Sequence, residues 1–298
     1  MQRLSIDTLR DRLGSAFAEA GTAAEFVFIG GDGLVAEIER GRDDARAGRL
    51  DGVVVGGGDG SVNAAAGVLA GSGVPLGVLP LGTLNHFAKD LGMPLELEQA
   101  AAAIASSEPR AVDVAEVNGR VFVNNSLLGA YPYMVSDRER RRRELGLGKW
   151  TAMSLAFLRM LARFPRRRIV LCMNDGKQRV RTPCLMVGVN EYDPRKLEIR
   201  RRHGMDRGEL WLLVAKHSNP LRFMWFAFRT AFLGLQRSGD FELLRLHAVE
   251  GRARASRVPV STDGEVMRLQ APLFYRIRPG DLRVLAPRRR WADGGAPL

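Results

Sequence analysis

Four glycines around one aspartate, GGGDGS at residues 56–61, form the first part of this sequence that suggests chemistry. Glycines let a chain turn sharply after a strand, so that backbone N–H groups and the next helix start face an anion. The loop lacks the ending of a Walker loop and the spacing of a dinucleotide fingerprint. Asp59 would repel a phosphate unless a divalent cation lay between them, so it is a candidate magnesium ligand. A glycine-rich turn without function is the alternative interpretation.

A second polar loop, PLGTLNHFAKDLG at residues 80–92, follows the next apolar run. Thr83 and Asn85 could hydrogen-bond a ligand, or Thr83 could cap a helix that opens at Leu84. Ligands of open α/β sheets bind beyond the carboxyl ends of the strands, which is where both loops are expected.

A third polar segment, STDGEV at residues 261–266, places Asp263 and Glu265 on either side of Gly264. Taken alone, such a segment is more often a solvated turn than a site.

Helices and strands alternate in the part of the chain that would position the two glycine loops. The periodicity predicts helices over 6–21, 34–48, 62–70, 84–91 and 97–106, and strands over 25–29, 52–55 and 75–79. This alternation is typical of a parallel sheet. A further GGDG at residues 30–33 is interpreted as a turn.

The second part of the chain consists of extended runs and tight turns. Asn118–Gly119 and Asp175–Gly176 are favoured hairpin turns. The expected strands are 112–117, 120–124, 168–173, 178–189, 209–215, 241–249, 252–260 and 265–269. An antiparallel β domain is therefore predicted, with residues 282–285 returning as a strand to the first domain.

The composition narrows the class of protein and of partner. The formal net charge of +12 favours an anionic partner, such as a nucleotide, an acidic membrane or nucleic acid. Cys172 and Cys184 indicate neither a zinc site nor a disulfide framework, which fits a reducing cytoplasm. Charged residues interrupt both 1–20 and 221–235, so neither a signal peptide nor a transmembrane helix is expected.

Together the motifs carry a resemblance that none of them carries alone. GGGDGSVNAAAG, GVLPLGTLNHFAKDLG, VDVAEVNGRVFVNNSLLG and STDGEV occur in this order. The chain thereby resembles the diacylglycerol kinase catalytic-domain family, which includes bacterial lipid kinases and sphingosine kinases. The resemblance implies an α/β fold: a three-layer, parallel-sheet nucleotide-binding domain, then an antiparallel β-sandwich domain. The expected ranges are 1–110 and 111–280, with a returning strand and tail at 281–298.

The resemblance also implies roles for individual residues. The residues matching the family's ATP-binding loops are Gly57, Gly58, Asp59, Gly60, Ser61, Gly82, Thr83 and Asn85. The family's magnesium network matches Asp59 and Asp113, but His86 stands where an aspartate is usual. The family's catalytic base region matches Asp263, expected to take the acceptor hydroxyl's proton, and Glu265, expected to support it.

A second departure lies at the start of the chain. Relatives open with a strand and an NPxxG turn beside the nucleotide, whereas this sequence begins with the helix that would follow. Either the start is truncated or the nucleotide site lacks one wall.

Basic and aromatic segments bear on the partner. Arginines cluster at 138–143, 166–168 and 200–202, and aromatic stretches lie at 147–164 and 221–235. We expect residues 223–235 to dock on a bilayer as an interfacial segment. The expected partner is a lipid substrate at an anionic membrane, with the protein cytoplasmic and peripherally bound to the inner face. Nucleic acid is not expected because no recognition pattern is evident; a homodimer stays open.

The function that this sequence favours is ATP-dependent phosphoryl transfer, with magnesium, to a hydroxyl of diacylglycerol or a related lipid alcohol. Two alternatives remain: an NAD kinase-like enzyme with a soluble substrate, and a noncatalytic nucleotide or lipid binder. The first loop and Asp263 are expected to meet at one site.

Overall fold

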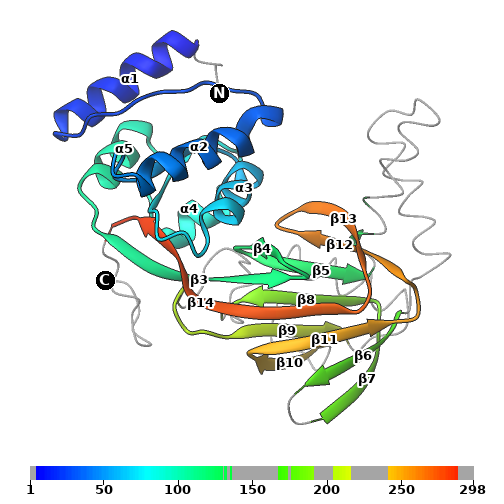
Figure 1. The fold of residues 1–298 in the computed structure, drawn as a ribbon. Helices are drawn as coiled ribbons and strands as arrows, with labels where there is room; N and C mark the ends of the chain where they lie inside the picture. Colours follow the sequence, from blue (N-terminus) through cyan, green and yellow to red (C-terminus); the bar gives the residue numbers. More distant parts are fainter. Residues whose placement is uncertain are drawn as a thin grey trace, which may run out of the picture. The chain divides into compact units, whose positions relative to one another are not determined.

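The computed structural model describes residues 5–129, 131–132, 135, 167–173, 176–190, 204–215 and 241–287. The chain divides into two compact units (Figure 1). Unit 1 comprises Met1–Val114, His203–Asp206 and Pro279–Leu298, and unit 2 comprises Ala115–Arg202 and Arg207–Arg278. Two of the passages between the units lie within strands, β3 (Pro109–Val117) and β14 (Leu273–Leu285), and the other two flank His203–Asp206.

Unit 1 is an α/β unit with a short parallel sheet. Its helices are α1 (Ile6–Glu19), α2 (Leu34–Arg46), α3 (Asp59–Leu69), α4 (His86–Leu91) and α5 (Leu97–Ala105). Strand β1 (Val53–Gly57) pairs in parallel with β2 (Leu76–Pro80). The end of β14 pairs in parallel with β2, with Val284 opposite Leu76. The predicted return of residues 282–285 to this sheet is therefore confirmed.

Two glycines show that helices cover both faces of this sheet. A Cβ on Gly41 of α2 would lie 3.1 Å from the Val53 side chain, whereas a Cβ on Gly77 would lie 3.0 Å from Val54 and from Ile104 of α5. Successive residues of a strand point to opposite faces. Helices α2 and α5 therefore lie on opposite sides of β1 and β2, which confirms the three-layer prediction.

The strand expected over residues 25–29 is not formed. The segment has no strand pairing, and Val27 and Ile29 are 47% and 43% exposed. β-branched residues favour strands only when a neighbouring strand completes the ladder. Among the described residues no such neighbour exists. The glycines that follow form a single 3-10 turn, Gly31–Gly33, which leads into α2, as expected.

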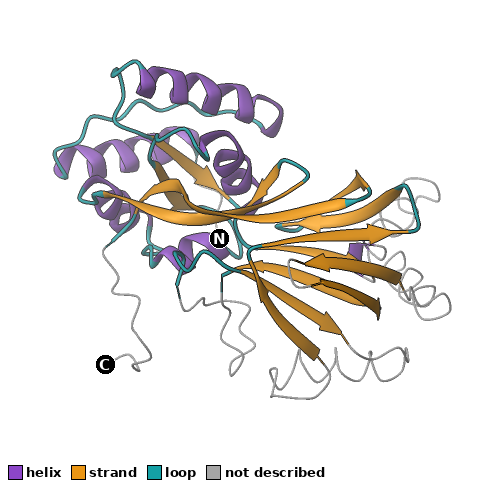
Figure 2. Cartoon of the chain, turned by 60° about the horizontal axis from the view of Figure 1, so that its bottom comes forward, coloured by secondary structure: helices purple, strands orange, loops and turns teal. Residues whose placement is uncertain are grey.

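Unit 2 is built from two antiparallel sheets. Figure 2 shows that strands make up most of this unit, whereas most of the helices belong to unit 1. One sheet has the order β14-β11-β6-β7 within this unit, and the other has the order β10-β9-β8-β5-β12-β13. The strands are β4 (Arg120–Phe122), β5 (Asn125–Gly129), β6 (Arg167–Met173), β7 (Gly176–Thr182), β8 (Cys184–Val189), β9 (Leu210–Ala215), β10 (Phe241–Leu246), β11 (Ala248–Ala253), β12 (Arg257–Thr262) and β13 (Glu265–Gln270).

The core of unit 2 mixes side chains from both sheets. Leu171 and Tyr275 come from the first sheet, and Val187, Leu212 and Val260 come from the second. All five are at most 3% exposed. Two antiparallel sheets with their inner faces packed together are a β-sandwich, so the predicted fold class is confirmed.

Three strands predicted as continuous are each divided. The runs 178–189, 241–249 and 252–260 break at Pro183, at His247 and at residues 254–256. At each break the chain crosses from one sheet to the other. Pro183 ends its strand because it has no N–H for the ladder. The predicted Asn-Gly turn between β3 and β4 is confirmed, because Asn118 and Gly119 have φ of 48° and 80°.

Several predictions fall on residues outside the described ranges. These are the basic runs 138–143 and 200–202, the stretches 147–164 and 221–235, and the turn residue Asp175. No helix in the described part of the chain has the length and the hydrophobicity that crossing a bilayer requires.

Candidate functional site

The two glycine loops of unit 1 lie in direct contact. A Cβ on Gly82, in the second loop, would lie 2.5 Å from Gly58 Cα, in the first loop. A real Cβ does not approach backbone this closely, so glycine is needed for the loops to meet. Strands β1 and β2 end side by side, with Gly57 opposite Pro80. The expectation that both loops leave the carboxyl ends of neighbouring strands is therefore confirmed.

The start of α3 presents free backbone donors. The N-cap residue is Gly58, and no side chain in the described ranges caps the helix. Val62 N donates to Gly58 O at 3.1 Å and is the first N–H of α3 to bond within the helix. The N–H groups before it, on Asp59, Gly60 and Ser61, have no intrahelical acceptor. An 11-residue helix that begins this way fits a phosphate group, because its dipole and its N–H groups both favour negative charge.

Asp59 links the two loops. Its Oδ1 accepts a hydrogen bond from His86 N at 2.8 Å, at the first residue of α4. Asn63 lies one helical turn beyond Asp59. Its buried Oδ1 has no hydrogen-bond partner among the described residues, and the same holds for His86 Nδ1. Asn63 was missed from the sequence, although its i, i+4 spacing from Asp59 within a predicted helix was a usable signal.

Asp113 is committed to the backbone of unit 1. Its side chain is 1% exposed, and its Oδ1 accepts from Gly280 N at 2.8 Å. No group of three acidic, histidine or cysteine residues that could hold a metal occurs in the described ranges. Asp59 therefore fits a magnesium ion only in the manner of a nucleotide complex, where one carboxylate suffices because phosphates and waters complete the shell.

Asn85 and Thr83 have different roles in the second loop. Asn85 has φ of 51°, its Oδ1 accepts from Gly82 N, and its Nδ2 donates to Pro80 O and Gly82 O. Its side chain thus shapes the loop. The predicted Thr83 cap is wrong, since α4 begins at His86 with Asn85 as N-cap. Thr83 is exposed, and its hydroxyl is left for a ligand.

The acidic segment of unit 2 is a tight hairpin between β12 and β13. Asp263 and Gly264 have φ of 48° and 89°, and Thr262 pairs with Glu265. Positive φ at both central residues is the type I′ turn that Asp-Gly favours. The segment is therefore a hairpin turn, whatever its further role.

The Asp263 carboxylate holds the segment between β4 and β5. Oδ1 accepts from Asn124 N and Asn125 N at 2.9 Å, and Oδ2 accepts from Val123 N at 2.8 Å. These bonds use three of the about four acceptor positions of a carboxylate. The Glu265 side chain is exposed and makes no hydrogen bond with the described residues. Sequence reasoning could not find the three donors, because any residue type supplies a backbone N–H.

Comparison with known proteins bears on this site. A sequence profile of the diacylglycerol kinase catalytic domain matches residues 39–117, which include both glycine loops and Asp113. A protein of Chromohalobacter salexigens named "Probable lipid kinase YegS-like" is 30% identical to this chain over 276 residues, which cover 89% of this chain and 84% of that protein. A probable lipid kinase YegS-like of Pseudomonas syringae pv. syringae is 46% identical over 74 residues, 24% of each chain.

Solved structures agree on the fold. The crystal structure of a putative diacylglycerol kinase from Bacillus anthracis str. Sterne superposes with a TM-score of 0.72 at 20% identity, covering 96% of this chain and 93% of that one. At this identity the likeness concerns the fold, whereas the relative from Chromohalobacter matches most of both sequences. The chain therefore belongs to the diacylglycerol kinase catalytic-domain family that includes the YegS-like probable lipid kinases.

Proposed function

We propose that this protein is an ATP-dependent lipid kinase that transfers the γ-phosphoryl group to a hydroxyl of diacylglycerol or a related lipid alcohol. One observation carries the proposal: the glycine loops after β1 and β2 touch beside the uncapped start of α3, in a chain of this family. That arrangement offers several N–H donors and a helix dipole to a polyphosphate.

The nucleotide would be held mainly by backbone. The N–H groups of residues 57–61 would bind phosphate oxygens, and the exposed Thr83 hydroxyl would add a donor. Gly82 and Asn85 act indirectly by keeping the second loop against the first. Asp59 would hold magnesium, and Asp113 would hold strand β3 against Gly280 of β14. When bound, magnesium offsets the charge on the transferring group.

Proton acceptance from the lipid hydroxyl falls to the acidic hairpin of unit 2. We assign the role of proton acceptor to Glu265, because its carboxylate is exposed and makes no hydrogen bond with the described residues. Asp263 acts as a positioning residue, because its carboxylate already accepts three backbone N–H groups. This reverses the roles expected from the sequence. That the hairpin meets the glycine loops stays a prediction.

Radiolabelled ATP incubated with the protein and a mixed lipid extract, followed by thin-layer chromatography, tests the function. A labelled lipid spot supports it. Label on added NAD instead, or no labelled product at all, contradicts it and favours an NAD kinase-like enzyme or a noncatalytic binder, respectively.

A matched pair of variants tests the phosphate loop. Gly58→Ala adds a methyl whose nearest neighbour is Gly82 Cα at an ordinary 3.7 Å, so the fold should survive. The methyl would crowd the anion position, and losing one charged hydrogen bond should weaken ATP binding roughly 10- to 100-fold. Gly67→Ala, on the same helix with no neighbour within 4 Å, is the control and should leave ATP binding unchanged. Unchanged ATP affinity in Gly58→Ala would contradict the assigned loop.

A further inference from the structure

The outer surface of the first sheet of unit 2 gathers arginines from separate strands. Arg252 pairs with Val170, and Val170 pairs with Arg179, so both arginines lie on one face. In the neighbouring ladder, Glu250 lies opposite Phe274. We call the exposed residues Arg179, Arg252, Arg254, Phe274 and Arg276 the basic face.

Burial separates this face from the core. In β14, Leu273, Tyr275 and Ile277 are buried, whereas Phe274 is 54% exposed. Single exposed hydrophobic side chains are common on protein surfaces. What distinguishes Phe274 is that it stands among arginines. The face is therefore amphipathic, with an aromatic ring at the level of cationic groups.

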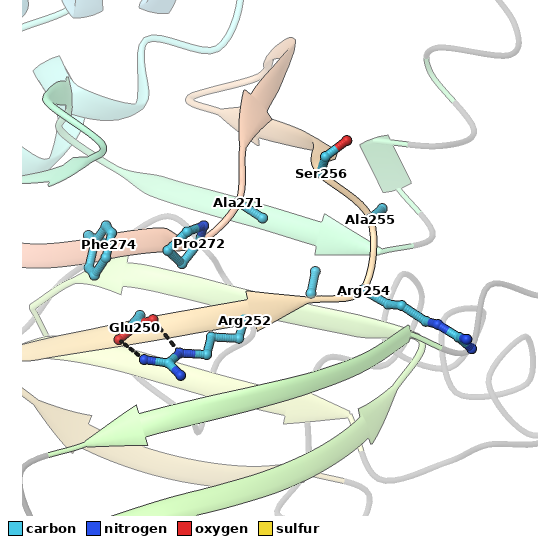
Figure 3. Close-up of a pocket in the computed structure, with 9 residues that line it drawn as sticks. Glu250, Arg252, Arg254, Ala255, Ser256, Ala271, Pro272 and Phe274 are labelled. Atoms are coloured by element: carbon cyan, nitrogen blue, oxygen red, sulfur yellow. Dashed lines mark hydrogen bonds and ion pairs between the residues drawn. The ribbon is translucent and has the colours of Figure 1, made fainter.

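Two glutamates neutralise only part of the charge. Arg252 is held by both oxygens of Glu250, at 2.5 and 3.2 Å, and Glu116 pairs with Arg276 at 2.6 Å and with Arg278 at 3.3 Å. Figure 3 shows Arg254 extending from the turn after β11, away from the Glu250–Arg252 pair. Neither Arg254 nor Arg179 forms an ion pair with a described residue. The face carries four arginines, and Glu250 and Glu116 are the two glutamates paired with them, so its net charge is positive.

A hollow lies between this face and the turn at residues 254–256. Its volume is about 540 Å³, and its wall includes Glu250, Arg252, Arg254, Ser256, Pro272 and Phe274 (Figure 3). The lining residues carry two arginines against one glutamate, beside an aromatic ring and a proline. This combination suits a group that is anionic at one end and apolar at the other.

The wall is held in place before any ligand binds. Asn118 Nδ2 donates to Gln270 O at 2.8 Å and to Pro272 O at 3.2 Å, and its Oδ1 accepts from Phe274 N at 2.7 Å. These three bonds from the β3–β4 turn fix the chain that carries the ring. A preformed surface loses less entropy on binding than a flexible one.

We propose that the basic face docks unit 2 on a bilayer containing anionic phospholipid, with Arg179 and Arg254 contacting headgroup phosphates and Phe274 at headgroup depth. The proposal rests on the proposed function, because a lipid kinase must reach a substrate held in a membrane. Charge complementarity selects this occupant, since a cationic surface with one exposed ring is what an anionic interface attracts.

Sedimentation with vesicles tests the docking. Wild-type protein and the variants Arg254→Gln and Arg179→Gln are compared on vesicles of phosphatidylglycerol with phosphatidylcholine, and on phosphatidylcholine alone. Each substitution should weaken binding to the anionic vesicles about fivefold, and added salt should weaken wild-type binding. Arg46→Gln, which removes an exposed arginine from α2 of unit 1, is the control and should bind within twofold of wild type.

The outcomes separate this proposal from the kinase proposal. The docking proposal is overturned if vesicle binding is unchanged in both variants, or if Arg46→Gln loses vesicle binding to the same extent. It is also overturned if Arg254 is needed for binding duplex DNA but not for binding vesicles. Activity toward lipid in neutral detergent micelles should be equal for Arg254→Gln and wild type. If no lipid is phosphorylated but vesicle binding still depends on Arg254 and Arg179, the kinase proposal fails and the docking stands.

Discussion

Replacing Asp263 by asparagine should destabilise the protein as well as slow it. Asparagine keeps one oxygen, which can still accept from Asn124 N and Asn125 N, but its NH2 group replaces the oxygen that accepts from Val123 N. Val123 is fully buried, so its N–H loses its partner and meets another donor. Losing a charge-assisted bond and leaving a buried donor unsatisfied should cost about 2–4 kcal/mol.

Asp263→Asn should remove this hydrogen bond without changing the conformation of the turn. Asp263 has φ of 48°, which asparagine adopts as readily as aspartate, and Asn-Gly is a favoured type I′ turn. The hairpin backbone therefore stays intact. Glu265→Gln is the matched control, because this exposed side chain has no partner in the described structure and its loss should change the free energy of unfolding by less than about 0.5 kcal/mol.

Urea titrations and turnover measurements on both variants decide the matter. Glu265→Gln should lower turnover by roughly two to four orders of magnitude at unchanged stability. Asp263→Asn should lower turnover only together with stability. If Asp263→Asn unfolds at the wild-type urea concentration, the reasoning about the three bonds is wrong. Near-normal turnover in Glu265→Gln would refute the proton assignment.

Three further predictions follow from single contacts. Gly82→Ala must push the second loop away from Gly58 Cα. It should therefore lower the free energy of unfolding by roughly 1–3 kcal/mol and raise the KM for ATP. A wild-type free energy of unfolding together with a wild-type KM would contradict the contact. Burial raises the pKa of the Cys184 thiol to about 11, so at pH 8 the reactive thiolate is scarce. Iodoacetamide should therefore label Cys184 roughly a hundredfold more slowly in the folded than in the urea-unfolded protein. Equal labelling rates, measured by mass spectrometry, would contradict the raised pKa. Asn118→Gly keeps the positive φ but removes three hydrogen bonds, so it should lower the urea midpoint by the equivalent of roughly 1–3 kcal/mol, and an unchanged midpoint would count against that clamp.

Local patterns predicted much of the fold. The helices α1, α2 and α5 occur close to their expected ranges, because apolar spacing and their ends lie within a few residues. The Asn118–Gly119 turn was predictable because few residues tolerate positive φ. The contact of the two glycine loops followed from the geometry of parallel strands.

Other features depended on neighbours distant in the chain. The run at residues 25–29 has strand-like residues but no partner among the described strands, so it remains unpaired. Runs such as 241–249 cross from one sheet to the other at His247. Because both sheets share one core and alternate in the same way, periodicity along the chain does not reveal the crossing.

The sequence by itself determined the residue types and turns of the candidate site: glycines after β1 and β2, an aspartate at the start of α3, and an acidic hairpin. Only the tertiary structure decided what those residues bind within the chain. Asn85 contacts its own loop, Asp59 contacts the start of α4, and Asp263 contacts Val123, which is 140 residues away in the sequence. The physical reason is that a turn depends on the backbone preferences of adjacent residues, whereas a hydrogen bond between distant segments depends on which surfaces packing brings together.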